Sequence, residues 1–106
     1  MRVALALVLL TSAVHADVDK QVIGRVVKRQ LMTIADCFQK AGRFDRVNVD
    51  FVIGKTGRVT LAVASGGGGN KALQSCVAGV FQRMKFPASP GVTKVSYPVQ
   101  ICVAGQ

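Results

Sequence analysis

The chain has 106 residues, a formal net charge of +9, one histidine and no tryptophan. Its acidic residues are five aspartates, and none of them forms a spaced pair that suggests a carboxylate dyad or a calcium loop. The only histidine, His15, lies in a segment that we expect to be removed, which excludes Ser-His-Asp and Cys-His mechanisms from the mature chain. We therefore expect a protein that is not an enzyme and that has no cofactor and no metal site.

Residues 1–16 have the pattern of a secretory signal peptide. Arg2 precedes an apolar stretch, Val3 to Leu10, and the small-residue end Val14-His15-Ala16 predicts cleavage after Ala16. The apolar stretch is well short of the roughly 20 residues that cross a bilayer. The pattern predicts a periplasmic or secreted protein without a stable membrane anchor, whose single domain spans residues 17–106.

The mature chain begins with a predicted amphipathic helix, from about Lys20 to Gly42. Asp19 is suited to cap its start, because a carboxylate can accept hydrogen bonds from the first free amides. Its apolar residues recur at intervals of three and four, at Ile23, Val27, Leu31, Ile34 and Phe38.

After Gly42 the apolar period changes to two. The runs 47–53 and 59–64 both alternate, and the short segment Gly54-Lys55-Thr56-Gly57 joins them. Two alternating runs around a glycine-containing turn predict an antiparallel hairpin with one face against a core.

The glycine run Gly66 to Gly69 invites comparison with a phosphate-binding loop, but no Gly-Lys-Ser/Thr follows at the required spacing. We interpret it as a flexible joint. Asn70 is a candidate cap for a second helix, from Lys71 to about Lys85. The apolar stripe of this helix consists of Leu73, Cys76, Val77, Val80, Phe81 and Met84.

The last run alternates apolar residues from Val95 to Val103 and contains Pro98. A proline cannot donate to a sheet ladder, so this strand is predicted at an edge, with the missing amide facing outward or at a bulge. An open edge can receive a guest strand. The predicted partner-binding edge consists of Lys94, Val95, Ser96, Tyr97, Pro98, Val99, Gln100 and Ile101.

Three cysteines allow three single disulfide pairings. We favour Cys37 with Cys76, because both lie on the apolar sides of predicted helices. The bond would close a loop of about 40 residues and contribute roughly 4 kcal/mol in the chain-entropy model. Cys102 is then left over, either as a small, partly buried hydrophobe or as the site of an intermolecular bridge.

Loss of Arg2 with the signal peptide leaves thirteen basic residues against five acidic ones, a net charge of +8. The densest basic groups are Arg25, Lys28 and Arg29, then Lys40, Arg43 and Arg46. A solvated surface is one interpretation, and attraction to anionic envelope polymers or lipid is another. Export and the scattered placement of the charges argue against a nucleic-acid partner.

The order helix, hairpin, helix and edge strand resembles the C-terminal domain of TonB-type energy transducers. It is more closely similar to the TonB-like AgmX/PglI C-terminal family of envelope proteins. The resemblance runs from Val22 to Ile101, and the cysteines placed in both helices are its strongest element. The matching segments are Val26 to Arg29, Ile34 to Phe38, Val47 to Gly54, Gly57 to Val59, Cys76-Val77, Phe86-Pro87, Gly91, and Val95 to Val99.

The resemblance implies an α+β fold with two helices on one face of a small three-stranded antiparallel sheet, and a last strand available for partner pairing. It further implies a role in envelope transport or motility machinery. Phe38-Gln39 stands where the family typically has Tyr-Glu, and the proline-rich spacer that precedes the domain in TonB transducers is not found here. What the resemblance implies is therefore the fold and a binding edge, rather than energy transduction.

Three hypotheses follow. The first is a non-enzymatic domain that binds an extended segment of an envelope protein along its last strand. The second is a cationic protein that binds anionic polymers or lipid. The third is a structural subunit that self-associates by edge pairing or through Cys102, so the oligomeric state stays open.

Overall fold

A computed structural model gives the structure of the protein and describes residues 18–101. Two helices come first, α2 (Lys20–Arg29) and α3 (Leu31–Ala41), followed by the strands β1 (Val47–Ile53) and β2 (Val59–Gly66). A short 3₁₀ turn, η1 (Gly67–Gly69), leads to α4 (Lys71–Gln82), and the last strand is β3 (Thr93–Val99). The predicted α+β class and the order helix, hairpin, helix, strand are confirmed.

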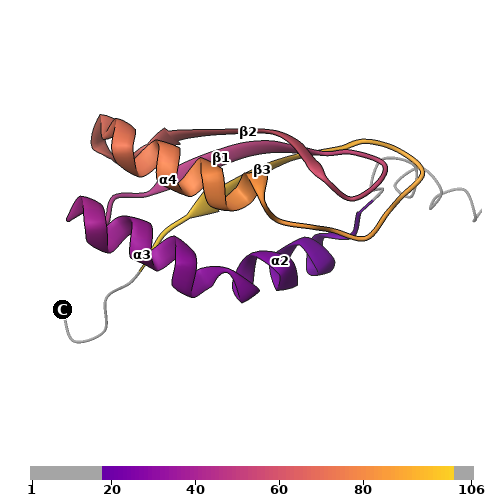
Figure 1. The fold of residues 1–106 in the computed structure, drawn as a ribbon, viewed down its shortest axis with the longest axis horizontal. Coiled ribbons are helices and arrows are strands. Elements are labelled where there is room, and N and C mark those ends of the chain that lie inside the picture. Colours follow the sequence, from indigo (N-terminus) through magenta and orange to yellow (C-terminus); the bar gives the residue numbers. More distant parts are fainter. Residues whose placement is uncertain (1–17, 102–106) are drawn as a thin grey trace, which may run out of the picture.

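The strands form an antiparallel sheet in the order β2-β1-β3. The hairpin strands are neighbours, and β3 pairs with the outer side of β1, so β1 is central and both other strands are edges. Figure 1 shows the helices gathered on one side of this sheet. The other face of the sheet is left open among the described residues.

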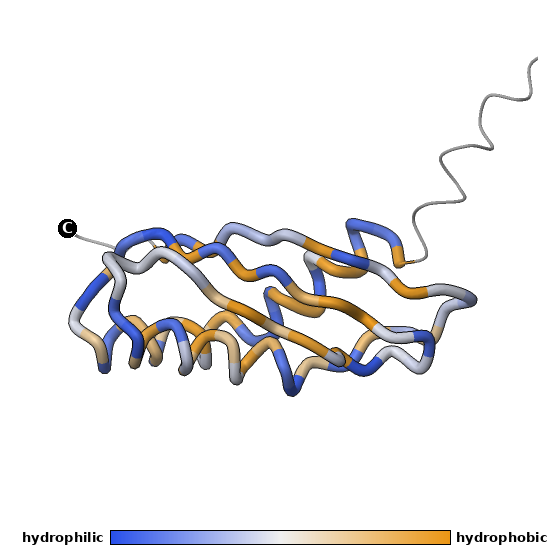
Figure 2. The backbone as a smooth tube through the Cα atoms, turned by 90° about the horizontal axis from the view of Figure 1, so that it is seen from above, coloured by the Kyte–Doolittle hydropathy of each residue, from blue (hydrophilic) through white to orange (hydrophobic). Residues whose placement is uncertain are grey.

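The hydrophobic core lies between the sheet and the helices. Val47, Val49, Phe51 and Ile53 alternate along β1, and all four are buried toward the helices. Phe51 packs against Phe81 of α4, with ring centroids 5.2 Å apart. Burying one such side chain contributes about 1.5–3 kcal/mol. In Figure 2 hydrophobic positions are concentrated along the strands and recur along the helices.

The predicted first helix is divided at Gln30 into α2 and α3. The backbone of Gln30 has φ −99° and ψ 10°, and its amide donates to the carbonyls of Val27 and Lys28. The expected apolar stripe is wrong at Leu31, which is 47% exposed, because the break turns it out of the line from Val27 to Ile34. Neither proline nor glycine stands at the break, so the sequence holds no signal for it.

A β-bulge changes the register of the hairpin between Val52 and Ile53. On the turn side of the bulge, Val59 is buried in the core. Beyond it, Leu61 and Val63 lie on the open face and are 54% and 52% exposed. The small residues Ala62 and Ala64 face the helices instead, and they are half-buried against the core. Because of the bulge, the small side chains of Ala62 and Ala64 lie beneath α4, and the larger side chains of Leu61 and Val63 lie on the open face.

The expected disulfide is confirmed. Cys37 of α3 is bonded to Cys76 of α4, with Cα atoms 5.7 Å apart and a sequence separation of 39 residues. The bond joins the two helices that pack against each other over the sheet. It removes loop-closure entropy from the unfolded chain, which is the main source of its stabilising effect.

Two glycine positions determine the connections. Gly57 has φ +92°, and a Cβ there would collide with the carbonyl oxygen of Phe86. The amide of Phe86 donates to the carbonyl of Gly57 at 2.9 Å, which fixes the chain after α4 to the hairpin turn. The run from Gly66 to Gly69 is left-handed at every residue, with φ between 64° and 88°. The predicted joint thus has a defined path into α4.

Candidate functional site

The predicted partner-binding strand lies at the edge of the sheet. β3 spans Thr93–Val99 and, within residues 18–101, pairs with β1 alone, while Gln100 and Ile101 follow the strand. Pro98 stands opposite Asn48 of β1. The sequence predicted the edge from Pro98, but only the structure shows that the neighbour is β1.

The direction of the backbone groups follows from one hydrogen bond at the end of the hairpin. The amide of Gly67 donates to the carbonyl of Arg46 at 2.8 Å, so Arg46 directs its carbonyl toward β2. Backbone groups alternate in direction along a strand. Even-numbered residues of β1 therefore bond toward β2, and odd-numbered residues bond toward β3.

The register then assigns the free groups of β3. Val95, Tyr97 and Val99 stand opposite odd-numbered residues of β1 and bond to it. Lys94, Ser96 and Pro98 direct their backbone groups away from the sheet. The missing amide of Pro98 thus costs the sheet no hydrogen bond. Within residues 18–101, the outward groups of β3 have no side-chain partner.

The opposite edge, β2, is held by α4. The side-chain amide of Gln82 donates to the carbonyl of Val59 at 2.6 Å, and that of Gln74 donates to the carbonyl of Gly66 at 2.8 Å. These two carbonyls lie at the two ends of β2. Within residues 18–101, the two ends of β2 thus have side-chain partners that β3 lacks, whereas the outward backbone groups in the middle of β2, at Ala62 and Ala64, are unpaired like those of β3.

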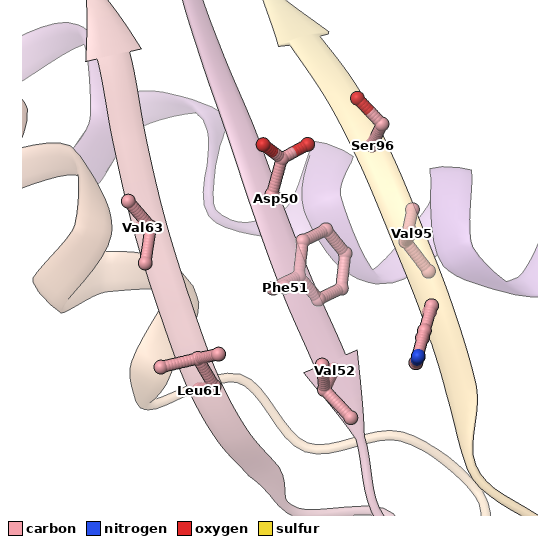
Figure 3. Close-up of a pocket in the computed structure, with 8 residues that line it drawn as sticks. Asp50, Phe51, Val52, Leu61, Val63, Val95 and Ser96 are labelled. Atoms are coloured by element: carbon pink, nitrogen blue, oxygen red, sulfur yellow. The ribbon is translucent and has the colours of Figure 1, made fainter.

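Two hollows flank β3, one on each face of the sheet. The open face has a shallow hollow of about 470 Å³, where Leu61, Val63 and Val52 lie beside Asp50 and Ser96 (Figure 3). On the helix side, a groove of about 240 Å³ runs between β3 and the start of α2. Its lining residues are Val18, Lys20, Ile23, Thr93, Lys94, Val95 and Ser96.

Thr93 is the buried polar residue of this helix-side groove. It is 7% exposed, and its hydroxyl has no hydrogen-bond partner in the part of the chain that the structure describes. Tyr97 also faces the helices, where its ring lies 6.2 Å from that of Phe81. The two side chains that could face a guest on the open side are instead Lys94 and Ser96, both exposed.

The six predicted basic-surface residues come from separate parts of the chain. Arg25, Lys28 and Arg29 lie on α2, Lys40 lies in the last turn of α3, and Arg43 and Arg46 lie between α3 and β1. Two of the second group are ion-paired: the ammonium of Lys40 lies 3.1 Å from a carboxylate oxygen of Asp36, and the guanidinium of Arg43 lies 2.7 Å from that of Asp45. The cations of α2 have no such partner among the described carboxylates.

Sequence reasoning missed the residues that distinguish the two edges. Gln74 and Gln82 are polar positions on α4, and nothing in the local pattern indicates that they bond to β2. It also missed Lys85, which joins the cations of α2 across the fold. Local sequence patterns could not have found these contacts, because they join different elements of the fold.

Other predictions concern chemistry and location. Within residues 18–101, no group of histidine, cysteine and acidic side chains is arranged to hold a metal ion. In the same range no helix combines the length and the apolar character needed to cross a membrane. The predicted signal peptide and Cys102 lie outside the described residues.

Comparison with known proteins gives no match for this chain: no family model, no curated protein and no solved structure is similar to it. The resemblance to TonB-type C-terminal domains therefore rests on the sequence segments named above and remains a hypothesis.

Proposed function

We propose that the protein is an exported, non-enzymatic binding domain of the TonB C-terminal type, which adds an extended segment of a partner protein to β3. The observation that carries this proposal is the difference between the two edges of the sheet. Side chains of α4 bond to both ends of β2, whereas the outward backbone groups of β3 have no such partner. An unpaired edge of this kind is a template for strand addition.

The free groups set the length of guest that can pair. Lys94 and Ser96 each offer an amide and a carbonyl, and Pro98 offers a carbonyl alone. Each hydrogen bond contributes only about 0.5–1.5 kcal/mol net, because the groups exchange water for a protein partner. We therefore expect a short ladder that weakens at Pro98, with further affinity from guest side chains in the two flanking hollows.

The charge at the edge favours a different chain over a second copy. Lys94 lies on β3 and Lys20 lines the adjacent groove, and among residues 18–101 no acidic residue lines that groove. Lysine on an edge strand disfavours self-pairing, because the same charge on the second copy approaches it. This argument makes a partner protein the preferred occupant over the self-associating subunit.

A matched pair of crosslinking variants tests the proposal. Ser96 of β3 and Ser65 of β2 are both exposed serines on the open face of an edge strand. We expect a photoreactive phenylalanine at Ser96 to join the exported protein to one discrete partner in intact cells, and the same group at Ser65 not to do so. Equal labelling at both positions, or none at Ser96, would contradict the proposal.

The salt dependence of the crosslink separates strand addition from polymer binding. Backbone hydrogen bonds survive at high ionic strength, whereas attraction through the net charge is screened beyond a Debye length of about 3 Å at 1 M salt. We expect the Ser96 crosslink still to form when the envelopes are washed at that salt concentration before irradiation. Its disappearance there would favour the cationic polymer-binding hypothesis.

A further inference from the structure

Two neighbouring grooves lie on the side of the domain where α2 meets the chain that follows α4. The first, the α2 groove, has a volume of about 370 Å³ and is lined by Val22, Arg25, Val26, Arg29, Lys85 and Pro87. The second, the α4 groove, has a volume of about 420 Å³ and is lined by Arg58, Val59, Gln82, Arg83, Met84 and Lys85. Lys85 lines both grooves, so they adjoin at this residue, and we refer to the two together as the cationic path.

The cations along this path have no acidic partner in the described structure. The two ion pairs of the described structure are formed by Lys40 and Arg43, and neither residue lines a groove of this path. Arg25 and Arg29 are one helical turn apart, a spacing at which like charges repel each other. No aspartate lines either groove. The fold thus holds a set of positive charges together without neutralising them.

The position of Lys85 is fixed by the backbone. It forms an isolated β-bridge with Arg58, and the next residue, Phe86, is buried and bonded to Gly57. On the other side of the path, Val22 and Val26 pack against the core and hold α2 in place. The backbone that carries the charges is therefore set before any ligand arrives, which lowers the ordering cost of binding.

Apolar residues make up part of the lining of the path, and we call this part its floor. Val22, Val26 and Pro87 line the α2 groove, and Val59 and Met84 line the α4 groove. A phosphate polymer would satisfy the charges but has no side chains to cover these residues. An acidic polypeptide with interspersed apolar residues matches both, because arginine binds carboxylates in a bidentate manner and the floor buries apolar groups.

We propose that these two grooves form a second binding surface, which receives an acidic polypeptide segment whose apolar residues cover Val22, Val26 and Pro87. The segment forms carboxylate pairs with Arg25, Arg29 and Lys85 and continues toward Arg83 and Arg58. This site is separate from β3 and does not depend on strand addition.

The probe is a fluorescent peptide of three Glu-Glu-Pro-Pro-Leu repeats, in which adjacent prolines remove amide donors from both sides of the chain and so disfavour addition to β3. Fluorescence anisotropy measures the affinity of the peptide for the folded, oxidised protein. A salt concentration of about 0.15 M limits the influence of remote charges, since the Debye length is then about 8 Å. The test variants are Arg29→Gln and Lys85→Gln, and each has a control that removes one charge outside the grooves. Lys28→Gln, on the same helix, is the control for Arg29→Gln, and Lys55→Gln is the control for Lys85→Gln. Lys28 and Lys55 are exposed and line neither groove.

We expect Arg29→Gln and Lys85→Gln each to weaken peptide binding about two- to fivefold, as for an exposed ion pair, and the two controls to change it much less. A peptide with glutamine in place of glutamate should lose binding, and one with serine in place of leucine should bind several-fold more weakly.

Three results would overturn the proposal: equal weakening by the control variants, tighter binding of polyphosphate or phosphatidylglycerol vesicles than of the peptide, or no binding of the acidic peptide. None of these results bears on the Ser96 crosslink, so the two proposals fail independently.

Discussion

The side-chain amide of Gln82 lies 2.6 Å from the carbonyl oxygen of Val59, and this contact bonds α4 to the edge of β2. Gln74 makes the equivalent contact at the other end of the strand, with Gly66. The two glutamines are two turns apart on one face of α4. A single helix therefore both covers the core and bonds to the two ends of one edge strand, a contact that β3 lacks among residues 18–101.

Removal of the two glutamine donors should destabilise the domain. Methionine keeps the length of the side chain and removes the amide, so we expect Gln74→Met with Gln82→Met to lower the free energy of unfolding by about 1–2 kcal/mol. Urea denaturation measures this change. Gln39→Met, at an exposed position of α3, is the control and should be nearly neutral. A double variant as stable as the control would show that the two bonds contribute nothing.

Hydrogen exchange should alternate along β3. The amides of Val95 and Tyr97 bond to β1, whereas those of Lys94 and Ser96 face outward, so we expect the outward pair to exchange faster by about an order of magnitude or more. Exchange followed by NMR on the free protein resolves the individual amides. Equal protection of neighbouring amides would mean that the free edge is already covered.

Loss of the disulfide should destabilise the domain more than loss of the two glutamine donors. We expect Cys37→Ala with Cys76→Ala to lower the free energy of unfolding by about 4 kcal/mol, because the unfolded chain regains the entropy of an open loop. Urea denaturation of the oxidised wild type and the variant gives the difference. The wild type in reductant should match the variant, and a loss below about 1 kcal/mol would contradict the expectation.

Alanine at two glycines should act in opposite directions. Gly57→Ala places a Cβ against the carbonyl of Phe86 at a left-handed position, so we expect a loss of more than about 2 kcal/mol. Gly24→Ala lies inside α2 with no atom within 4 Å of the new Cβ, so we expect a gain of about 0.5–1 kcal/mol. Thermal unfolding of both variants measures the two effects. If Gly57→Ala were neutral, the close approach to Phe86 would not exist in solution.

The buried hydroxyl of Thr93 should be unfavourable in the free domain. Thr93→Val keeps the shape and removes an unpartnered polar group, so we expect the free energy of unfolding to rise by about 1 kcal/mol. Thr33→Val, at an exposed position of α3, is the control for the same chemical change. Denaturant unfolding compares the two. A loss of stability at Thr93 would indicate that its hydroxyl has a partner, such as an ordered water molecule.

Local signals in the sequence predicted most of the fold. Asp19 accepts a hydrogen bond from the amide of Gln21, and Asn70 accepts one from that of Leu73, as expected for helix caps. The alternation of β1 and β2 located the hairpin, because one face of a half-buried strand is apolar. The pairing of Cys37 with Cys76 followed from their helical faces. Each of these signals is local, because the conformation of a short segment is set mainly by the residues within it.

The rest depends on contacts between distant segments. The break at Gln30 and the bulge beside Val52 have no proline or glycine at the site, so local pattern does not locate them. The open edge was predicted from Pro98, but the reason that β2 is less open lies in α4. The fold likewise places Lys85 beside the cations of α2. The sequence analysis did not include Lys85 in either basic group, because it lies far from them in the chain.

The left-handed backbone from Gly66 to Gly69 has a consequence for the choice of amino acids. These φ values are ordinary for residues of D configuration, which are the mirror images of those that ribosomes use. A chemically synthesised chain with D-alanine at Gly69 would have φ in its own favoured region there, and the unfolded chain would lose conformational freedom relative to glycine. Within the genetic code, glycine alone takes up this handedness without strain.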